Sequence, residues 1–185
     1  AVQFANGAVL SPDAAVVVTI TGPFTAGQHQ IFTTGAGTIS FAGGKVRELI
    51  PQWWGANGAD GTSDTTAIQA AIDAAAGAVF ANGRLPIFLP TGLYQTTAPL
   101  VVTSNFIKIR GAGVGRSAVG GTVISRQGTD NFPVVFYVAP ALRVDLRYGA
   151  ALVTGAGSSL EVRAATNDTF LDFQEALAPR VFNGL

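Results

Sequence analysis

The stretch "GADGTSDTTAIQAAIDAAA" at residues 58–76 is the one clear helical pattern in a chain otherwise made of short β-type runs. Its apolar residues recur at i, i+3, i+4 and i+7, which is the spacing of one face of a helix: Ile68, Ala71, Ile72 and Ala75. Ser63 and Asp64 can accept the free amide hydrogens of a first turn, and Gly77 is a suitable stop signal. The spacing predicts a helix over residues 64–76.

Short β-rich runs separated by Gly, Thr, Ser, Asn or Pro fill the rest of the chain. We predict strands in the runs at 16–20, 29–33, 37–42, 85–90, 105–110, 122–126, 134–138, 142–147, 151–155, 159–164 and 169–174. Glycine, at 23 of 185 residues, exceeds the roughly 7% that is usual, which favours many tight corners. The pattern indicates an all-β sandwich, barrel or solenoid.

The charge composition restricts the classes of partner. Eleven basic residues balance eleven acidic ones, so nothing favours nucleic acid or an anionic membrane as a partner. Charged residues make up 12% of the chain, against roughly 25% in ordinary globular proteins. We therefore expect the chain to hide surface by forming oligomers or by stacking on itself. It contains no cysteine, which excludes disulfides and cysteine metal sites.

Two longer segments carry a resemblance to a known family. They are "IPQWWGANGADGTSDTTAIQAAIDAA" (50–75) and "LPIFLPTGLYQTTAPLVVTSNFIKIRGAGVGRS" (85–117). In this order they resemble the N-terminal signature of the pectate-lyase-like, right-handed parallel β-helix superfamily, over roughly residues 50 to 126. The preceding segment, from residue 22, is similar to the leader found before this signature in phage tail-spike proteins.

The resemblance implies an all-β fold: a short right-handed parallel β-helix with an N-terminal capping α-helix and β-rich flanking segments. The first rung of such a solenoid exposes an apolar cross-section and unpaired backbone groups, and an amphipathic helix can cover both. We expect a β-rich leader or attachment segment at 1–50 and the capping helix with the first rungs at 51–126. Further rungs or a β-rich tail are expected at 127–185.

Catalytic residues are not evident in the chain. Asp145, Glu161 and Asp172 are the acidic residues within strand-like runs, and the hydrolase motifs of the family are absent. The single histidine, His29, is expected to be a surface or packed residue. No pattern suggests a cofactor or a metal. We expect this segment alone not to be an enzyme.

Aromatic and charged residues supply candidate contacts to a glycan or to another subunit. Trp53 and Trp54 are adjacent, so in an extended chain one would pack inward and the other would be exposed or lie at a subunit contact. The resemblance described above favours packing as their role. Tyr137 and Tyr148 are further candidates for stacking on a sugar.

The last third of the chain contains a charge pattern that supplies four more candidates. Laid over each other at a shift of 18 residues, "LRVDLR" (142–147) and "LEVRA" (160–164) align their apolar residues. The shift also places opposite charges together: Arg143 with Glu161, and Asp145 with Arg163. We favour stacked parallel strands, while an antiparallel meander that turns at 154–159 is the alternative.

The resemblance implies a structural, receptor-facing segment of a phage-type spike or fibre. Its expected location is the virion, or alternatively outside the cell as a secreted protein. The expected partners are two further copies in a homotrimer, other virion proteins and a host surface polysaccharide. Two alternatives remain open: part of a polysaccharide lyase or glycoside hydrolase whose catalytic rungs lie elsewhere, and a stand-alone carbohydrate-binding module.

Overall fold

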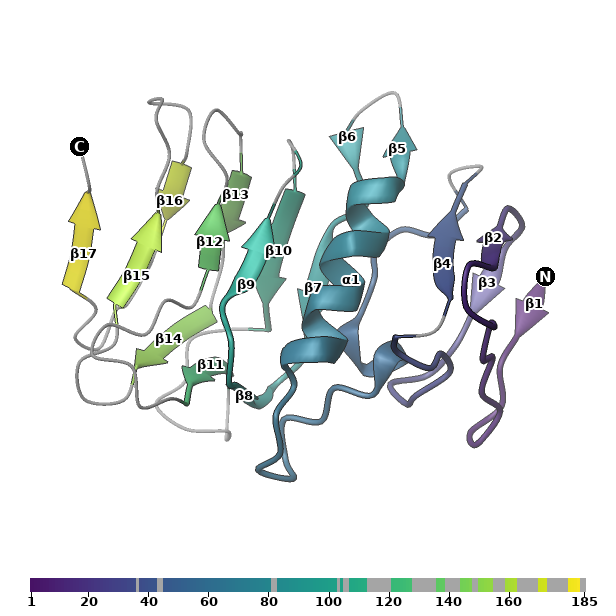
Figure 1. Cartoon of the computed structure of the whole chain (residues 1–185), viewed down its shortest axis with the longest axis horizontal. Helices are drawn as coiled ribbons and strands as arrows, with labels where there is room; N and C mark the ends of the chain where they lie inside the picture. The colour runs from purple at the N-terminus through teal and green to yellow at the C-terminus, as the bar shows by residue number, and fades with distance from the viewer. Residues whose placement is uncertain are drawn as a thin grey trace.

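The chain is mostly β-structure with one α-helix and predominantly parallel strand pairing, in the part that the structure describes (Figure 1). The computed structural model describes residues 1–35, 37–42, 45–80, 83–102, 104, 107–112 and 121–127. Beyond these it describes the strand segments 136–138, 144–147, 150–154, 159–162, 170–172 and 180–183.

The described elements up to residue 102 comprise nine strands, a 3₁₀ turn and the helix. They are β1 (Val2–Gln3), β2 (Val17–Ile20), β3 (Phe24–Thr25), β4 (Thr38–Phe41), η1 (Pro51–Trp54), α1 (Thr65–Gly77), β5 (Val79–Phe80), β6 (Gly83–Arg84), β7 (Ile87–Leu89), β8 (Gly92–Thr96) and β9 (Leu100–Val102). The later ones are β10 (Ile107–Gly111), β11 (Thr122–Arg126), β12 (Phe136–Val138), β13 (Val144–Arg147), β14 (Ala150–Thr154), β15 (Ser159–Val162), β16 (Phe170–Asp172) and β17 (Arg180–Asn183).

From β7 onward the described strands pair in parallel within four sheets. β7, β10, β13 and β16 pair in parallel in one sheet, and β8, β11 and β14 pair in parallel in a second. β9 pairs with β12, β12 contacts β15, and β15 pairs with β17. β1 and β17 consequently lie at opposite ends of the long axis of the molecule (Figure 1).

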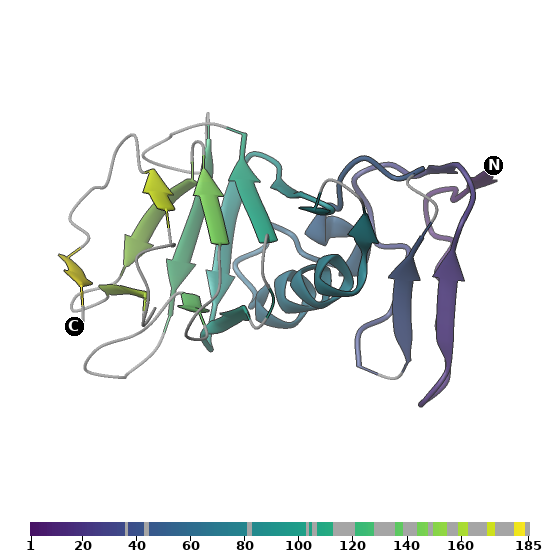
Figure 2. The same ribbon diagram turned by 90° about the horizontal axis from the view of Figure 1, so that it is seen from above.

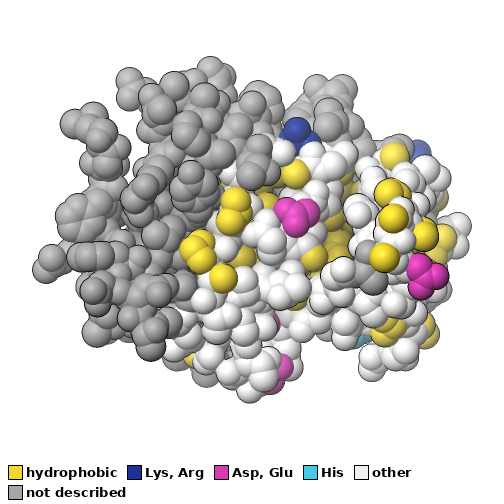
Figure 3. Space-filling view, viewed as in Figure 1, with side chains coloured by type: hydrophobic (Ala, Val, Ile, Leu, Met, Phe, Trp, Pro, Cys, Tyr) yellow, Lys and Arg dark blue, Asp and Glu magenta, His cyan; other side chains and the backbone are white. Residues whose placement is uncertain are grey.

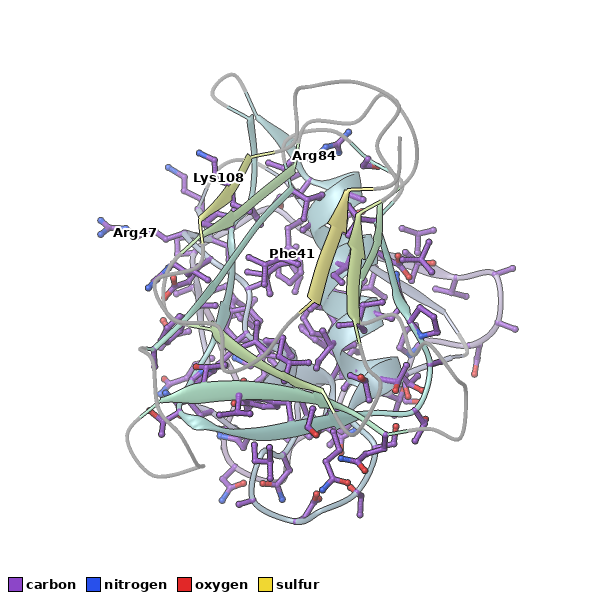
Figure 4. All side chains as sticks on the ribbon, turned by 90° about the vertical axis from the view of Figure 1, so that its left-hand side faces the viewer. Phe41, Arg47, Arg84 and Lys108 are labelled. Atoms are coloured by element: carbon purple, nitrogen blue, oxygen red, sulfur yellow. The ribbon has the colours of Figure 1, made fainter. Side chains whose placement is uncertain are left out.

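Alternation along the strands β7 to β10 separates a buried face from a more exposed one. In β10, Ile107 and Ile109 are buried while Lys108 and Arg110 are exposed, as expected for side chains that alternate between the two faces of a sheet. Figure 4 looks along the stack and shows Lys108 pointing outward, whereas Phe41 lies in the interior. Arg110 forms an exposed ion pair with Glu48 and lies over the ring of Phe88.

The helix α1 packs between the leader strands and the stacked strands (Figures 1 and 2). Its predicted apolar face is confirmed, since Ile68, Ala71, Ile72 and Ala75 are at most 1% exposed. It contacts η1 and β4 on one side and β7, β9 and β10 on the other. At roughly 25 cal/mol per Å² of buried apolar surface, two isoleucines buried in this way contribute several kcal/mol together.

Polar side chains at the start of α1 and on its second turn bind free backbone groups of β8, of β9 and of the loop between them. The Gln69 amide accepts from Val101 N at 2.8 Å and donates to Val101 O at 2.9 Å. Thr65 Oγ1 accepts from Thr97 N at 2.8 Å. The helix therefore covers both an apolar surface and a strand edge, which is how natural proteins protect exposed edges.

An aromatic cluster joins the leader to η1. Phe24 and Trp53 have ring centroids 4.8 Å apart, and Phe32 and Trp54 lie 5.2 Å apart. Phe4 and Phe41 complete the cluster. A single apolar core runs through these residues and α1 to the stacked strands, so it crosses the predicted boundary near Pro51.

Two strand predictions need correction. Residues 29–33 form a single bridge, from Phe32 to Leu10, because Ile31 N and Phe32 N both donate to Trp53 O rather than to a strand. The 18-residue register is also wrong. β13 pairs with β10 and β16, which places Asp145 beside Lys108 and Phe170, whereas Glu161 of β15 lies beside Phe182.

The alternative, an antiparallel meander, is also not observed in the described strands, because β14 pairs in parallel with β11 and β15 pairs in parallel with β17. The physical reason for the register error is the length of each turn of chain. Paired residues are 37 positions apart between β10 and β13 (Ile107 with Val144) and 21 apart between β15 and β17 (Ser159 with Arg180). The predicted shift of 18 residues is shorter than either.

Candidate functional site

A pocket of about 420 Å³ lies where the leader, the loop after η1 and the corner between β7 and β8 meet. Gln28, His29 and Gln30 line it from the leader. Gln52 and residues 55–59 line it from η1 and the following loop, and Pro90, Thr91 and Tyr94 from the corner. Its volume falls within the range of sites for small ligands.

Gln52 and Tyr94 form a buried hydrogen-bonded pair in the pocket wall. The Tyr94 hydroxyl donates to Pro90 O at 3.0 Å and accepts from Gln52 Nε2. Because a phenol has one hydrogen, this arrangement fixes the orientation of the Gln52 amide. Burial raises the pKa of Tyr94 to about 12, so the hydroxyl stays protonated at neutral pH.

Two polar atoms of the pocket residues have no hydrogen-bond partner among the described residues. They are Gln52 Oε1, on a side chain that is 9% exposed, and His29 Nε2. His29 folds back toward Gly27, where an added Cβ atom would lie 2.8 Å from His29 Nδ1. A buried polar atom that lacks a partner is unfavourable by about 1–3 kcal/mol.

A close backbone contact shapes the loop wall of the pocket. Leu93 N donates to Gly58 O at 2.7 Å. A Cβ atom added at Gly58 would lie 2.9 Å from the Cα atom of Gly92. Only glycine therefore allows this loop to approach β8 so closely.

Asp64 holds the same loop against β8. Its Oδ1 atom accepts from Asn57 N at 2.6 Å and its Oδ2 atom accepts from Gln95 N at 3.0 Å. Asp64 is 2% exposed, and this burial raises the pKa of its carboxyl although both N–H donors act to lower it. The prediction that its side chain caps α1 is wrong, because both oxygens bind other segments and no side-chain cap bond forms.

The pocket offers hydrogen bonding and no evident covalent chemistry. None of its lining residues is Lys, Arg, Asp or Glu. Among the described residues, no group of three or more His, Cys, Asp or Glu is placed to hold a metal ion. The wall presents amides, a histidine and a hydroxyl, which suit a neutral ligand that donates and accepts hydrogen bonds.

The sequence-derived site residues do not gather around this pocket. Trp53 and Trp54 are both buried, at 7% and 5% exposed, which agrees with the packing role that the resemblance favours. The alternative of one exposed indole is wrong. Both residues lie in η1, and Trp53 Nε1 donates to Gly27 O at 3.1 Å. The compact 3₁₀ turn, unlike an extended chain, directs both indoles into the aromatic cluster.

The remaining site predictions fall in the last third of the chain. Tyr137, Asp145 and Glu161 lie on β12, β13 and β15, and the structure does not bring Asp145 and Glu161 into neighbouring strands. Arg143, Tyr148 and Arg163 lie outside the described residues.

Sequence reasoning missed the pocket and set His29 aside. The residues of the pocket come from three segments that are distant in the chain, and neutral amides form no recognisable sequence motif. The one usable signal was Gly92 at the corner where β8 begins, since a glycine in a strand indicates close backbone approach.

Comparison of the chain with protein-family models, with curated proteins and with solved structures finds no match. Within the described residues, no helix has both the length and the apolar character that crossing a membrane requires.

Proposed function

We propose that the stacked strands form a short right-handed parallel β-helix of the pectate-lyase-like type. The supporting observation is a ladder of aliphatic residues in register. Ile87 of β7 pairs with Ile109 of β10, which pairs with Leu146 of β13, which pairs with Leu171 of β16. A right-handed path is the rule where parallel strands of one sheet are joined by a crossover.

In this proposal α1 is the N-terminal cap. The contacts of Asp64, Thr65 and Gln69 with free backbone groups of β8, β9 and their connecting loop support that role. The isoleucines of the helix cover the apolar cross-section below. An uncovered end of this kind would be an aggregation site.

The function that these features support best is structural and receptor-facing: a segment of a phage-type spike or fibre that assembles as a homotrimer and binds a host surface polysaccharide. The capped stack of parallel strands carries this proposal, since such a stack makes an elongated, rigid body. The resemblance of residues 50–126 to the superfamily signature adds to it. The protein would be located in the virion, where other virion proteins would bind the leader.

The surface of the leader supports assembly with further copies. Val2, Val9, Val16 and Val17 are 45–60% exposed, and all four belong to the leader. Figure 3 shows apolar side chains on this part of the visible face with few charged ones beside them. Large exposed apolar areas usually mark an interaction surface.

Light scattering of the purified chain tests the proposal. We expect a particle of three times the 18.9 kDa chain mass. Val17→Lys should shift the particle toward monomer, because it places a charge in the proposed contact. Val101→Lys is the matched control, since Val101 is 37% exposed on β9, away from the leader. A monomeric parent protein would overturn the trimer.

Incubation with acidic polysaccharides tests the enzymatic alternative. We expect no new reducing ends and no unsaturated products. Turnover that is lost in Asp145→Asn or in Glu161→Gln would contradict a purely structural role.

A further inference from the structure

We infer that the pocket between the leader and the β7–β8 corner binds a neutral sugar unit, with Gln52 Oε1 accepting a ligand hydroxyl and His29 Nε2 forming a second hydrogen bond. This inference rests on the receptor-facing part of the proposed function and not on the trimeric assembly. It assigns the binding to a site formed by the leader, the loop after η1 and the corner between β7 and β8.

The orientation of the Gln52 amide carries the first step. The single phenolic hydrogen of Tyr94 is used by Pro90 O, so Gln52 must direct its NH₂ group to Tyr94 and leave Oε1 without a donor. A glutamine whose amide is held in this way and whose oxygen lacks a partner needs an external donor. The hydroxyl of a ligand supplies one.

The histidine provides the second contact. His29 Nε2 also lacks a partner among the described residues, and a neutral imidazole can donate or accept there according to its tautomer. Both side chains line the same pocket, so a ligand with several hydroxyls could satisfy both atoms. A ligand that donates to Gln52 Oε1 and bonds to His29 Nε2 recovers the free energy that these unpaired atoms lose.

The charge around the pocket selects a neutral ligand. The lining residues offer no cation to pair with a carboxylate. Two acidic residues lie beside the pocket loop: Asp60 next to Ala59, and Asp64, whose carboxylate binds Asn57 N. The carboxylate of an acidic sugar would lose hydration here and find no Lys or Arg in the lining to compensate for it. Tyr94 is fully buried, so recognition depends on hydrogen bonds rather than on stacking.

Saturation-transfer NMR with the full chain tests the inference. The neutral probes are methyl α-glucoside, methyl α-galactoside, methyl α-mannoside and N-acetylglucosamine, and the acidic probe is glucuronate. We expect at least one neutral probe to bind with millimolar affinity and glucuronate to give no signal. Absence of binding by all the neutral probes, or equal binding of glucuronate, would overturn the inference.

Variants then locate the binding. Ala59→Trp fills the mouth of the pocket from an exposed position, and His29→Phe keeps a ring but removes Nε2. Each should weaken binding at least tenfold. Ala98→Trp is the matched control, since Ala98 is exposed and does not line the pocket. Unchanged affinity in Ala59→Trp would refute the site.

The two proposals fail separately. A trimer that binds no neutral probe overturns this site alone. A monomeric protein that binds a neutral probe, and loses this binding in Ala59→Trp, supports the site and overturns the trimeric assembly.

Discussion

Replacing Asp64 by alanine should destabilise the chain strongly, because its carboxylate ties three segments together. The substitution leaves Asn57 N and Gln95 N without their acceptors, which lie at 2.6 and 3.0 Å. A hydrogen bond to a charged group contributes about 1.5–3 kcal/mol, so the gross loss is about 3–6 kcal/mol. The variant no longer buries a carboxylate, and this offsets part of the lost stability. We expect the free energy of unfolding to fall by about 2–4 kcal/mol in total.

Thermal unfolding followed by circular dichroism measures the effect. For a chain of this length, the expected loss lowers Tm by roughly 4–16 °C. Asp64→Asn should fall between the parent and Asp64→Ala, because it keeps one acceptor oxygen. Asp60→Ala is the matched control: its carboxylate also accepts a backbone N–H, from Thr62, but it is exposed and water replaces it. If Asp64→Ala melts within a degree or two of Asp60→Ala, the bridging role is wrong.

Three further predictions concern the cap and its surroundings. Ile72→Asp should lower the free energy of unfolding by more than about 4 kcal/mol in urea, because it buries a charge. Thr66→Asp, at an exposed position of α1, should leave this free energy nearly unchanged. Similar unfolding curves for both variants would contradict the role of α1 as a cap. Gly58→Ala should destabilise by about 1–3 kcal/mol through its contact with β8, while Gly77→Ala, which meets nothing within 4 Å, should be neutral or stabilising by up to about 1 kcal/mol. Burial raises the pKa of Asp64 in the folded state, so the folded state binds more protons than the unfolded state just above the ordinary value of 3.8. The contribution of this group to stability is therefore complete below that pH and is lost as pH rises through the folded pKa. The stability difference between the parent and Asp64→Asn should therefore shrink as pH increases from about 3.8, and a difference that grows would refute the sign.

Local patterns in the sequence predicted the helix and most strand positions correctly. The apolar spacing of α1 depends on residues three and four apart, which the sequence displays directly. β11 occupies the predicted residues 122–126, because a β-rich run bounded by turn residues is also a local pattern.

The features that failed depend on residues far apart in the chain. The carboxylate of Asp64 binds Asn57 and Gln95, and the second partner lies 31 positions away. The register of β13 depends on the length of the intervening turns, which apolar alternation does not encode. The pocket residues are mainly amides and small residues, with a histidine and a tyrosine, and they come together only when three segments meet.

The central claim is that the strands after α1 stack in parallel, in register, as a β-helix. The chain lacks cysteine, so a pair of introduced cysteines reports proximity without background. Lys108 of β10 and Asp145 of β13 are register partners, and paired strands lie about 4.8 Å apart, within the span of a disulfide. The double variant Lys108→Cys with Asp145→Cys should form an intrachain disulfide on mild oxidation, detected by peptide mass spectrometry. Asp145→Cys with Glu161→Cys should not; efficient cross-linking of that pair, with none between positions 108 and 145, would contradict the stack.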